Sequence, residues 1–259
     1  MNTLRRHFKT ILKIFAGLLF TFAIFVYFYV FYGLPDVRDI ESGFALPSTR
    51  IYDRNGILLY EILPPEQGRN RVVPLEAIPQ PCINAVVATE DANYWSHLGV
   101  DPVGIVRAAW INIRGGQLIA GGSTITQQTA RILLLDFDER ANRSIRRKLR
   151  EMVLAIQLQN QSSKDHVLSL YLNQVYFGNL AYGIEAAAQT YFHKDATQLS
   201  TAECALLAGL IQNPVYHDPL SNLDNAQARQ AVVLNLMVAR GITSINRGRV
   251  ETSEKATIF

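Results

Sequence analysis

Residues 121–135 read GGSTITQQTARILLL, and this stretch decides the secondary structure at the centre of the chain. Two glycines lead into Ser123 and Thr124, and hydroxyl side chains of this kind cap the first turn of a helix. Thr124 and Gln127 have the spacing of a capping box, in which each side chain bonds the backbone of the other residue. The stretch therefore predicts a capped helix that runs to Leu135. Its free N–H groups also suit a phosphate, although a plain glycine turn before a helix would look similar.

Further helices are predicted on both sides of this stretch. Pro102 stands at a natural first helical position and Gly115 at a natural end, which predicts a helix over 102–114. Ser200 and Glu203 fit a second capping box, which opens a helix towards Ile211. The remaining helices are expected over 83–91, 139–160, 164–173 and 224–240.

One β-hairpin is predicted ahead of the helices. Residues 49–52 and 57–62 are aliphatic and β-branched runs, and the Asn55-Gly56 pair between them favours a tight turn. The expected organisation is a linker over 33–48, one mainly α domain over 49–241 with this small β-hairpin region at its start, and a polar tail over 242–259.

Residues 14–32 read IFAGLLFTFAIFVYFYVFY and carry no charge. At about 1.5 Å per residue, this length spans the hydrocarbon core of a bilayer. A buried core helix and a cleaved signal peptide are the alternatives, but the apolar stretch is long for a signal and no small-residue cleavage site follows it. Basic residues precede it and tyrosines gather at its far end. We expect an uncleaved transmembrane anchor, with residues 1–13 as a basic cytoplasmic segment and everything after Gly33 outside.

Charge and cysteine content exclude several classes of protein. The net charge of +3 depends on four basic residues in the first thirteen positions, and the rest of the chain carries 21 basic and 22 acidic residues. The basic balance is therefore no argument for nucleic-acid binding. Cys82 and Cys204 are too few for a disulfide scaffold or a structural zinc site. Both lie in apolar helical contexts, so we expect buried free thiols.

Two segments could carry chemistry. Residues 90–101, EDANYWSHLGVD, place acids and a histidine beside large aromatic side chains, and apolar walls of this kind can make a carboxylate a competent base. Solvated acids at a helix end, with Tyr94 and Trp95 packed in the core, are the simpler alternative. A metal site at His97 has too few ligands to be favoured.

The second segment is basic and runs from Arg140 to Glu151. On one long helix Arg143, Arg147 and Glu151 form a single stripe. A solvated face is the usual fate of such a run, but one-sided charge favours an anion that offsets the repulsion.

In order and spacing, these segments resemble the peptidoglycan glycosyltransferase family, the transglycosylase module of class A penicillin-binding proteins and of monofunctional transglycosylases. The resemblance covers roughly 49–240. The family's E-D-x-x-F-x-x-H-x-G motif is matched by Glu90, Asp91, His97 and Gly99, with Tyr94 in the aromatic position. Its G-x-S-T-[IL]-[ST]-Q-Q motif is matched by Gly121, Ser123, Thr124, Ile125, Thr126, Gln127 and Gln128, followed by Arg131.

Four more motifs follow in order. R-K-x-x-E is matched by Arg147, Lys148 and Glu151, and Y-L-N-x-[VI]-x-[FY]-G by residues 171–178, which include Asn173. Later blocks match at 183–192 and 205–214. Ile132 stands where the family has Asn, and Ser169 where it often has Glu, which puts efficiency in question more than identity.

The resemblance implies a mainly α, lysozyme-like glycosyltransferase fold that polymerises lipid II with inversion at C1 and releases undecaprenyl pyrophosphate. It implies Glu90 and Glu151 as catalytic residues, Glu90 as the general base and Glu151 assisting at the pyrophosphate. The implied substrate-binding residues are Asp91, His97, Ser123, Thr124, Gln127, Gln128, Arg131, Arg147, Lys148 and Asn173. No metal ligands are expected and no cofactor is required, although some family members use a divalent cation, Mg²⁺ or Mn²⁺, at the pyrophosphate. Expected partners are lipid II, the growing glycan chain, the membrane and other cell-wall synthesis proteins, with no nucleic acid. The expected location is the bacterial inner membrane, with the catalytic domain on the extracytoplasmic side.

Two alternatives stay open. A lytic, lysozyme-like enzyme would also use one glutamate in a helical fold, but it has no need of the cationic segment. A non-catalytic scaffold built on a decayed polymerase would fit Ile132 and Ser169. No S-x-x-K or K-T-G transpeptidase set is present, so the chain is either monofunctional or, as we favour, the front of a longer bifunctional protein.

Overall fold

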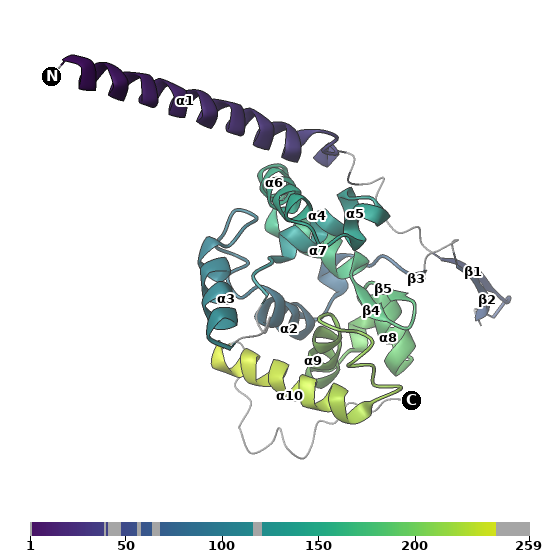
Figure 1. Cartoon of the computed structure of the whole chain (residues 1–259). Coiled ribbons are helices and arrows are strands. Elements are labelled where there is room, and N and C mark those ends of the chain that lie inside the picture. The colour runs from purple at the N-terminus through teal and green to yellow at the C-terminus, as the bar shows by residue number, and fades with distance from the viewer. Residues whose placement is uncertain are drawn as a thin grey trace.

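The computed structural model describes residues 2–38, 40, 48–55, 58–63, 68–115 and 121–241. A long helix, α1 (Asn2–Phe31), leads into a rounded body of helices, and two small sheets lie at one side of that body (Figure 1). The described part of the chain is mainly helical, which confirms the predicted fold class.

Three helices from distant parts of the sequence pack together in the lower half of the body, α2 (Gln80–Glu90), α9 (Thr201–Leu210) and α10 (Leu223–Ala239) (Figure 1). Small side chains permit the close approach, since Ala85, Ala88, Ala205 and Ala208 have no exposed surface. Burial of apolar surface in this cluster holds α2, and with it Glu90 at its last position, against the rest of the body.

A second set of helices forms the upper half, α4 (Ile125–Leu134), α6 (Ile145–Gln161) and α7 (Lys164–Gln174). Leu133, Leu154 and Leu158 pack in a second apolar cluster between them. The predicted capping box of α4 is confirmed: the Thr124 side chain accepts from the Gln127 N–H, and the Gln127 side chain accepts from the Thr124 N–H.

The predicted hairpin is also confirmed, with β1 (Thr49–Tyr52) antiparallel to β2 (Leu58–Ile62). A three-stranded sheet that the sequence does not predict has the order β3-β5-β4, in which β3 (Arg69–Asn70) is parallel to β5 (Ala181–Tyr182), and β4 (Tyr176–Gly178) is antiparallel to it. The other elements are α3 (Pro102–Gly115), α5 (Phe137–Ala141), α8 (Ile184–Phe192) and the short 3-10 turns η2 (Leu75–Ala77) and η3 (Ala196–Gln198).

The single helix predicted over 139–160 is wrong, because the chain breaks between α5 and α6. Ser144 adopts an extended conformation and its side chain accepts from the Arg147 N–H, so it caps a new helix rather than continuing the old one. Arg140 therefore lies in α5 and Arg143 in the connection. The predicted stripe reduces to Arg147 and Glu151.

The expectation of free thiols is also wrong, since Cys82 and Cys204 form a disulfide. Cys82 lies near the start of α2 and Cys204 in the middle of α9, and the packing of these helices brings the two Cα atoms to 4.5 Å. Both cysteines are buried, as predicted, but a separation of 122 residues gave no local sign that they meet.

The predicted membrane span is part of α1, which begins earlier than the apolar stretch does. Thr10–Phe31 has a mean hydropathy of 2.3, and only 6% of its most apolar window is buried against the rest of the protein. Among the described residues, this is the one helix long and apolar enough to cross a membrane. The polar tail predicted over 242–259 lies outside the described residues.

Candidate active site

Glu90 ends α2, and its half-buried carboxylate meets the first turns of α4. Gln128 Nε2 donates to Glu90 Oε2 over 2.9 Å, and Tyr171 Oη donates to Gln128 Oε1 over 3.1 Å. The tyrosine thus sets the orientation of the amide, and the amide holds one carboxylate oxygen. Among the described residues, nothing donates to the other oxygen, Oε1. That oxygen is available as a proton acceptor.

The electrostatic surroundings of Glu90 suit a base. Burial raises the pKa of Glu90 above its usual range, and the neighbouring Asp91 charge adds to the shift. The Gln128 hydrogen bond and the charges of Arg229 and Arg131 oppose it. A carboxylate with a raised pKa accepts a proton more readily than an exposed one.

Arg229 is a part of this site that sequence reasoning missed. It comes from α10, and its Nε is buried with no hydrogen-bond partner in the described chain. A Cβ atom added at Gly209 of α9 would lie 2.9 Å from Arg229 Cγ, so the glycine makes room for this side chain. No local signal could have found Arg229, because only the packing of α10 against α2 and α9 brings it to Glu90.

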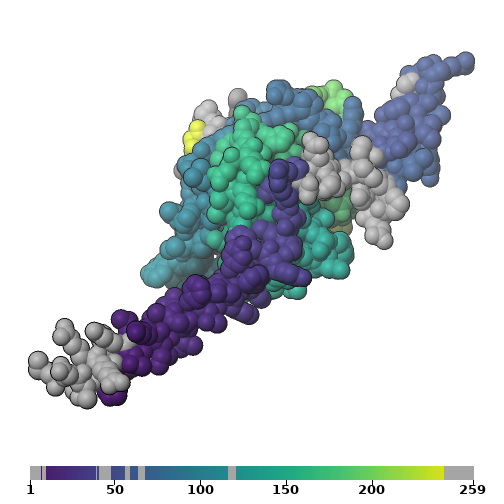
Figure 2. Space-filling model, turned by 90° about the horizontal axis from the view of Figure 1, so that it is seen from above, coloured from purple at the N-terminus to yellow at the C-terminus, as the bar shows by residue number. Residues whose placement is uncertain are grey.

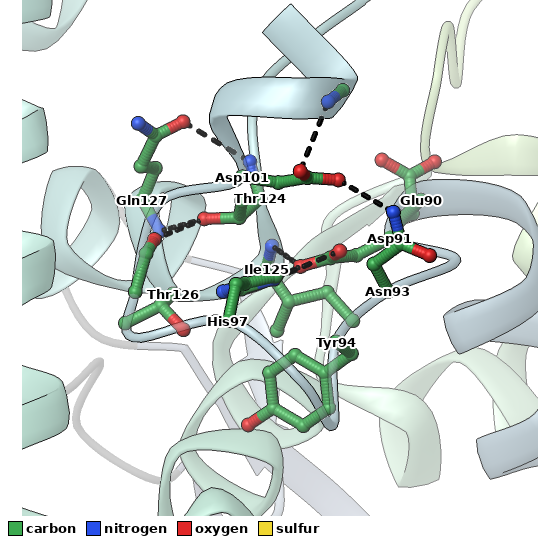
Figure 3. A network of polar contacts seen from close by, with 12 residues as sticks. Glu90, Asp91, Asn93, Tyr94, His97, Asp101, Thr124, Ile125, Thr126 and Gln127 are labelled. Carbon is green, nitrogen blue, oxygen red and sulfur yellow. Dashed lines mark hydrogen bonds and ion pairs between the residues drawn. The ribbon is translucent and has the colours of Figure 1, made fainter.

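Asp91 and His97 lie behind Glu90 in a buried network, and Figure 3 shows Glu90 and Asp91 pointing in different directions. Asp91 Oδ2 accepts from the Ile125 N–H over 3.0 Å, and His97 Nε2 lies 2.9 and 3.0 Å from the two Asp91 oxygens. Thr124 Oγ1 donates to the Gly99 carbonyl over 2.6 Å. These contacts join the end of α2 to the start of α4, so Asp91, His97 and Thr124 lie where they hold the site together.

The position of Gly99, in the segment that carries His97, requires a glycine for a steric reason. Gly99 has φ +91°, a conformation that side chains rarely adopt, and a Cβ atom there would lie 2.4 Å from the Ala155 carbonyl oxygen. The loop that carries His97 therefore lies directly against the backbone of α6.

On the other side of α4, basic residues surround Glu151. We call Arg131, Arg147 and Lys148 the cation cluster. Lys148 Nζ lies 3.1 Å from Glu151 Oε2, Arg147 forms an ion pair with Glu151 Oε1, and Arg131 Nε lies 3.9 Å from the same oxygen. Lys148 reaches Glu151 although it lies one residue beyond Arg147, because residues at i and i+3 are also neighbours on a helix surface.

Lys148 also connects α6 to the start of α4. Its Nζ donates to Ser123 Oγ over 2.6 Å and to Gln127 Oε1 over 3.3 Å. Burial lowers the pKa of Lys148, and the Glu151 carboxylate opposes that shift. About a third of the Lys148 and Arg131 side chains is exposed, whereas Glu151 is 1% exposed. Lys148 and Arg131 can therefore meet a ligand, and Glu151 holds them in place.

The structure does not bring Asn173 to this site. Its side chain is buried and bonds backbone groups only, accepting from the Val73 N–H over 2.9 Å and donating to the Val73 and Ser169 carbonyls. Asn173 thus fastens the segment after β3 to α7. The two residues that depart from the family pattern, Ile132 and Ser169, also make structural contacts. Ile132 contacts both apolar clusters, and the Ser169 carbonyl accepts from Asn173.

The described side chains around Glu151 do not suit a divalent cation. No group of three or more His, Cys, Asp or Glu side chains that could hold a metal occurs in the described ranges. Glu151 is the carboxylate nearest the cation cluster, and both of its oxygens already face cations. A metal ion placed there would be repelled by the arginines and the lysine.

A mainly helical domain with one base, a capped helix start and a partly exposed cluster of three cations has the parts of a group-transfer enzyme acting on an anionic substrate. The family model described as Transglycosylase matches residues 55–238, and the chain belongs to this family. Residues 55–238 are therefore its transglycosylase domain.

Two relatives of this chain agree with this assignment. The chain is 42% identical over 231 residues to "Penicillin-binding protein 1A" of Aquifex aeolicus (strain VF5), covering 89% of this chain and 30% of the relative. It is 40% identical over 218 residues to the protein of the same name from Escherichia coli (strain K12), covering 83% and 25%. A crystal structure of penicillin-binding protein 1A from Haemophilus influenzae matches 82% of this chain and 21% of that one, at 25% identity and a TM-score of 0.46. The chain thus spans less than a third of these relatives' lengths.

Proposed function

We propose that this chain polymerises lipid II into β-1,4-linked glycan chains and releases undecaprenyl pyrophosphate. The observation that carries the proposal is the pair Gln127–Gln128 on α4. Gln128 binds the base Glu90, and Gln127 accepts from Lys148, so a proton acceptor and a cation cluster are joined through consecutive residues. Transfer from a sugar diphosphate needs both, one for the attacking hydroxyl and one for the leaving group.

Glu90 acts as the general base. Its free Oε1 takes the proton of the 4-hydroxyl of the acceptor sugar, while that oxygen attacks C1 of the reducing-end sugar of the growing chain. The bond from C1 to the diphosphate oxygen breaks on the opposite side, the diphosphate leaves with the electron pair, and C1 is inverted. The raised pKa of Glu90 supports this step, because a stronger base makes the hydroxyl a better nucleophile.

The cation cluster stabilises the leaving diphosphate. Three cations around one carboxylate leave a net charge of about +2. The stabilisation that this charge provides increases as negative charge develops on the leaving oxygen. Lys148 and Arg131 meet the diphosphate, and Arg147 and Glu151 are positioning residues for them. The domain's own cations therefore offset the charge of the diphosphate.

The N-terminal helix supports a reaction at a membrane surface. Its apolar segment anchors the chain in the inner membrane, with the basic residues 1–13 in the cytoplasm and the domain on the extracytoplasmic side. A lipid-linked donor and acceptor are then available in the same surface. The growing glycan chain and other cell-wall synthesis proteins are the partners expected there.

The test is turnover of lipid II by the full chain and by Glu90→Gln. The amide keeps the shape of the carboxylate but cannot accept a proton, so turnover falls by about 10²–10⁴-fold. Glu76→Gln, at an exposed glutamate of η2, is the matched control and retains the parent rate. Activity of Glu90→Gln within tenfold of the parent contradicts the assignment of the base. Release of soluble muropeptides from intact sacculi, without polymer formation from lipid II, favours a lytic enzyme instead.

A further inference from the structure

The C-terminal end of α1 needs hydrogen-bond donors that the helix itself does not supply. The last carbonyls of any helix lack partners inside it and form the negative end of its dipole. No basic residue lies in the last turn of α1. The chain leaves the helix through Gly33, whose φ is +68°. The carbonyls of Tyr29, Tyr32 and Gly33 therefore have to be satisfied from elsewhere, by water, by headgroups or by another part of the protein.

Two arginines of α6 supply the donors, and we call Arg146 and Arg150 the docking arginines. Arg146 donates from Nε to the Tyr29 carbonyl over 2.8 Å and from a terminal nitrogen to the Tyr32 carbonyl over 3.1 Å. Its guanidinium also lies 5.8 Å from the centre of the Tyr29 ring. Arg150 donates to the Gly33 carbonyl over 2.5 Å. These bonds join residues more than a hundred positions apart.

The contact between the end of α1 and α6 also includes buried and apolar side chains. Arg150 is buried and forms a second contact, 3.1 Å, with Glu139 of α5. Val30 at the end of α1 is 5% exposed, and Val37 after it lies in the apolar cluster beside Leu154 and Leu158 of α6. Figure 2 shows the end of α1 lying against the body while the rest of the helix projects away from it.

The same helix, α6, presents the docking arginines and two members of the cation cluster, Arg147 and Lys148, on different sides. Arg146 and Arg150 are four residues apart and share one face, whereas Arg147 and Glu151 are turned by about 100° from them. The end of the anchor thus contacts the same 17-residue helix that carries Arg147, Lys148 and Glu151.

We propose that Arg146 and Arg150 are positioning residues that dock the anchor on α6 and so set the height of the cation cluster above the membrane. This inference rests on the proposed function, because the height matters only if the ligand of the cluster is the diphosphate of a membrane-embedded lipid. With the anchor docked, the cluster stays at the level of that diphosphate. With the anchor undocked, the domain samples other heights and tilts, and fewer encounters are productive.

The test compares two substrates with one preparation, the full chain in nanodiscs of phosphatidylethanolamine and phosphatidylglycerol. One substrate is lipid II embedded in the disc, and the other is a short-chain, water-soluble analogue with the same disaccharide diphosphate. For Arg146→Ala we expect kcat/KM for embedded lipid II to fall about tenfold relative to the soluble analogue, as the loss of hydrogen bonds from a charged donor allows. Hydrogen exchange of residues 29–38 should rise in the same variant.

Two further variants separate docking from other causes. Arg143→Ala removes the same charge from the connection before α6, where it makes none of these contacts, and should leave both readouts within twofold of the parent. Arg146→Lys keeps the charge but cannot donate in the same two-point geometry, so it should resemble Arg146→Ala.

An unchanged ratio between the two substrates overturns the proposal, as does unchanged exchange at residues 29–38. Equal loss with both substrates also overturns it, since that is the effect of a damaged domain. Full activity of Arg146→Lys on embedded lipid II would show that a positive charge near anionic headgroups is enough and that docking is not required, which also overturns the proposal. Failure of the proposed function is distinct, because the parent itself would then turn over neither substrate.

Discussion

The disulfide between α2 and α9 is the most direct feature of the structure to perturb. Cys82 and Cys204 close a loop of 122 residues, and a cross-link of that length removes unfolded-chain entropy worth about 5 kcal/mol at 25 °C. Measured values for such bonds are about 2–4 kcal/mol, because reduced unfolded chains keep some structure. For a domain of this size, about 3 kcal/mol corresponds to a fall in Tm of about 6–12 °C.

The assay is thermal unfolding of the full chain in detergent micelles, followed by circular dichroism with and without a thiol reductant. The protein is prepared by export, since the domain is expected on the oxidising side of the membrane. The double variant Cys82→Ala with Cys204→Ala should melt at or below the reduced parent, because it also loses two buried sulfur atoms. Reductant should leave the Tm of this variant unchanged.

Thiol counting provides the result that would refute the reasoning. Denatured, unreduced parent protein should show no reactive thiol, since both of its cysteines are paired. Two reactive thiols in that sample would contradict the disulfide. A reductant that exposes both thiols but leaves Tm unchanged would contradict the stabilising effect, even though the bond exists.

The remaining predictions concern the site. Because burial raises the pKa of Glu90, kcat/KM should fall as pH drops through a midpoint above the ~4.3 of an ordinary glutamate, since a protonated carboxyl cannot accept a proton; a midpoint at or below that value contradicts the burial effect. Lys148→Ala should lower kcat about 10²-fold in detergent micelles with lipid II as the only anion, whereas Arg140→Ala, in α5, should change little, and equal effects would remove the role of Lys148. Asn173→Ala should lower the free energy of unfolding by about 1–3 kcal/mol through its lost bonds to Val73 and Ser169, with KM unchanged. A raised KM without lost stability would return Asn173 to the substrate site.

Local rules were enough for much of this protein. The α4 capping box, the hairpin between β1 and β2, and the apolar anchor each depend on residues within one turn or one short segment, so the sequence alone predicts them. The order and spacing of the motifs also predicted the family and brought Glu90, Gln128 and Lys148 forward as candidates, and the structure places these residues around α4.

Contacts between distant segments were decided only by the tertiary structure. The pairing of Cys82 with Cys204, the approach of Arg229 to Glu90 and the docking of Arg146 on the end of α1 all depend on how helices pack, and spacing along the chain carries no record of that. Asn173 is the opposite case, in which a local motif predicted a role that the tertiary contacts do not support. Its motif predicted a substrate contact, but the fold surrounds it with backbone groups, and a buried amide bonds whatever donors and acceptors lie beside it.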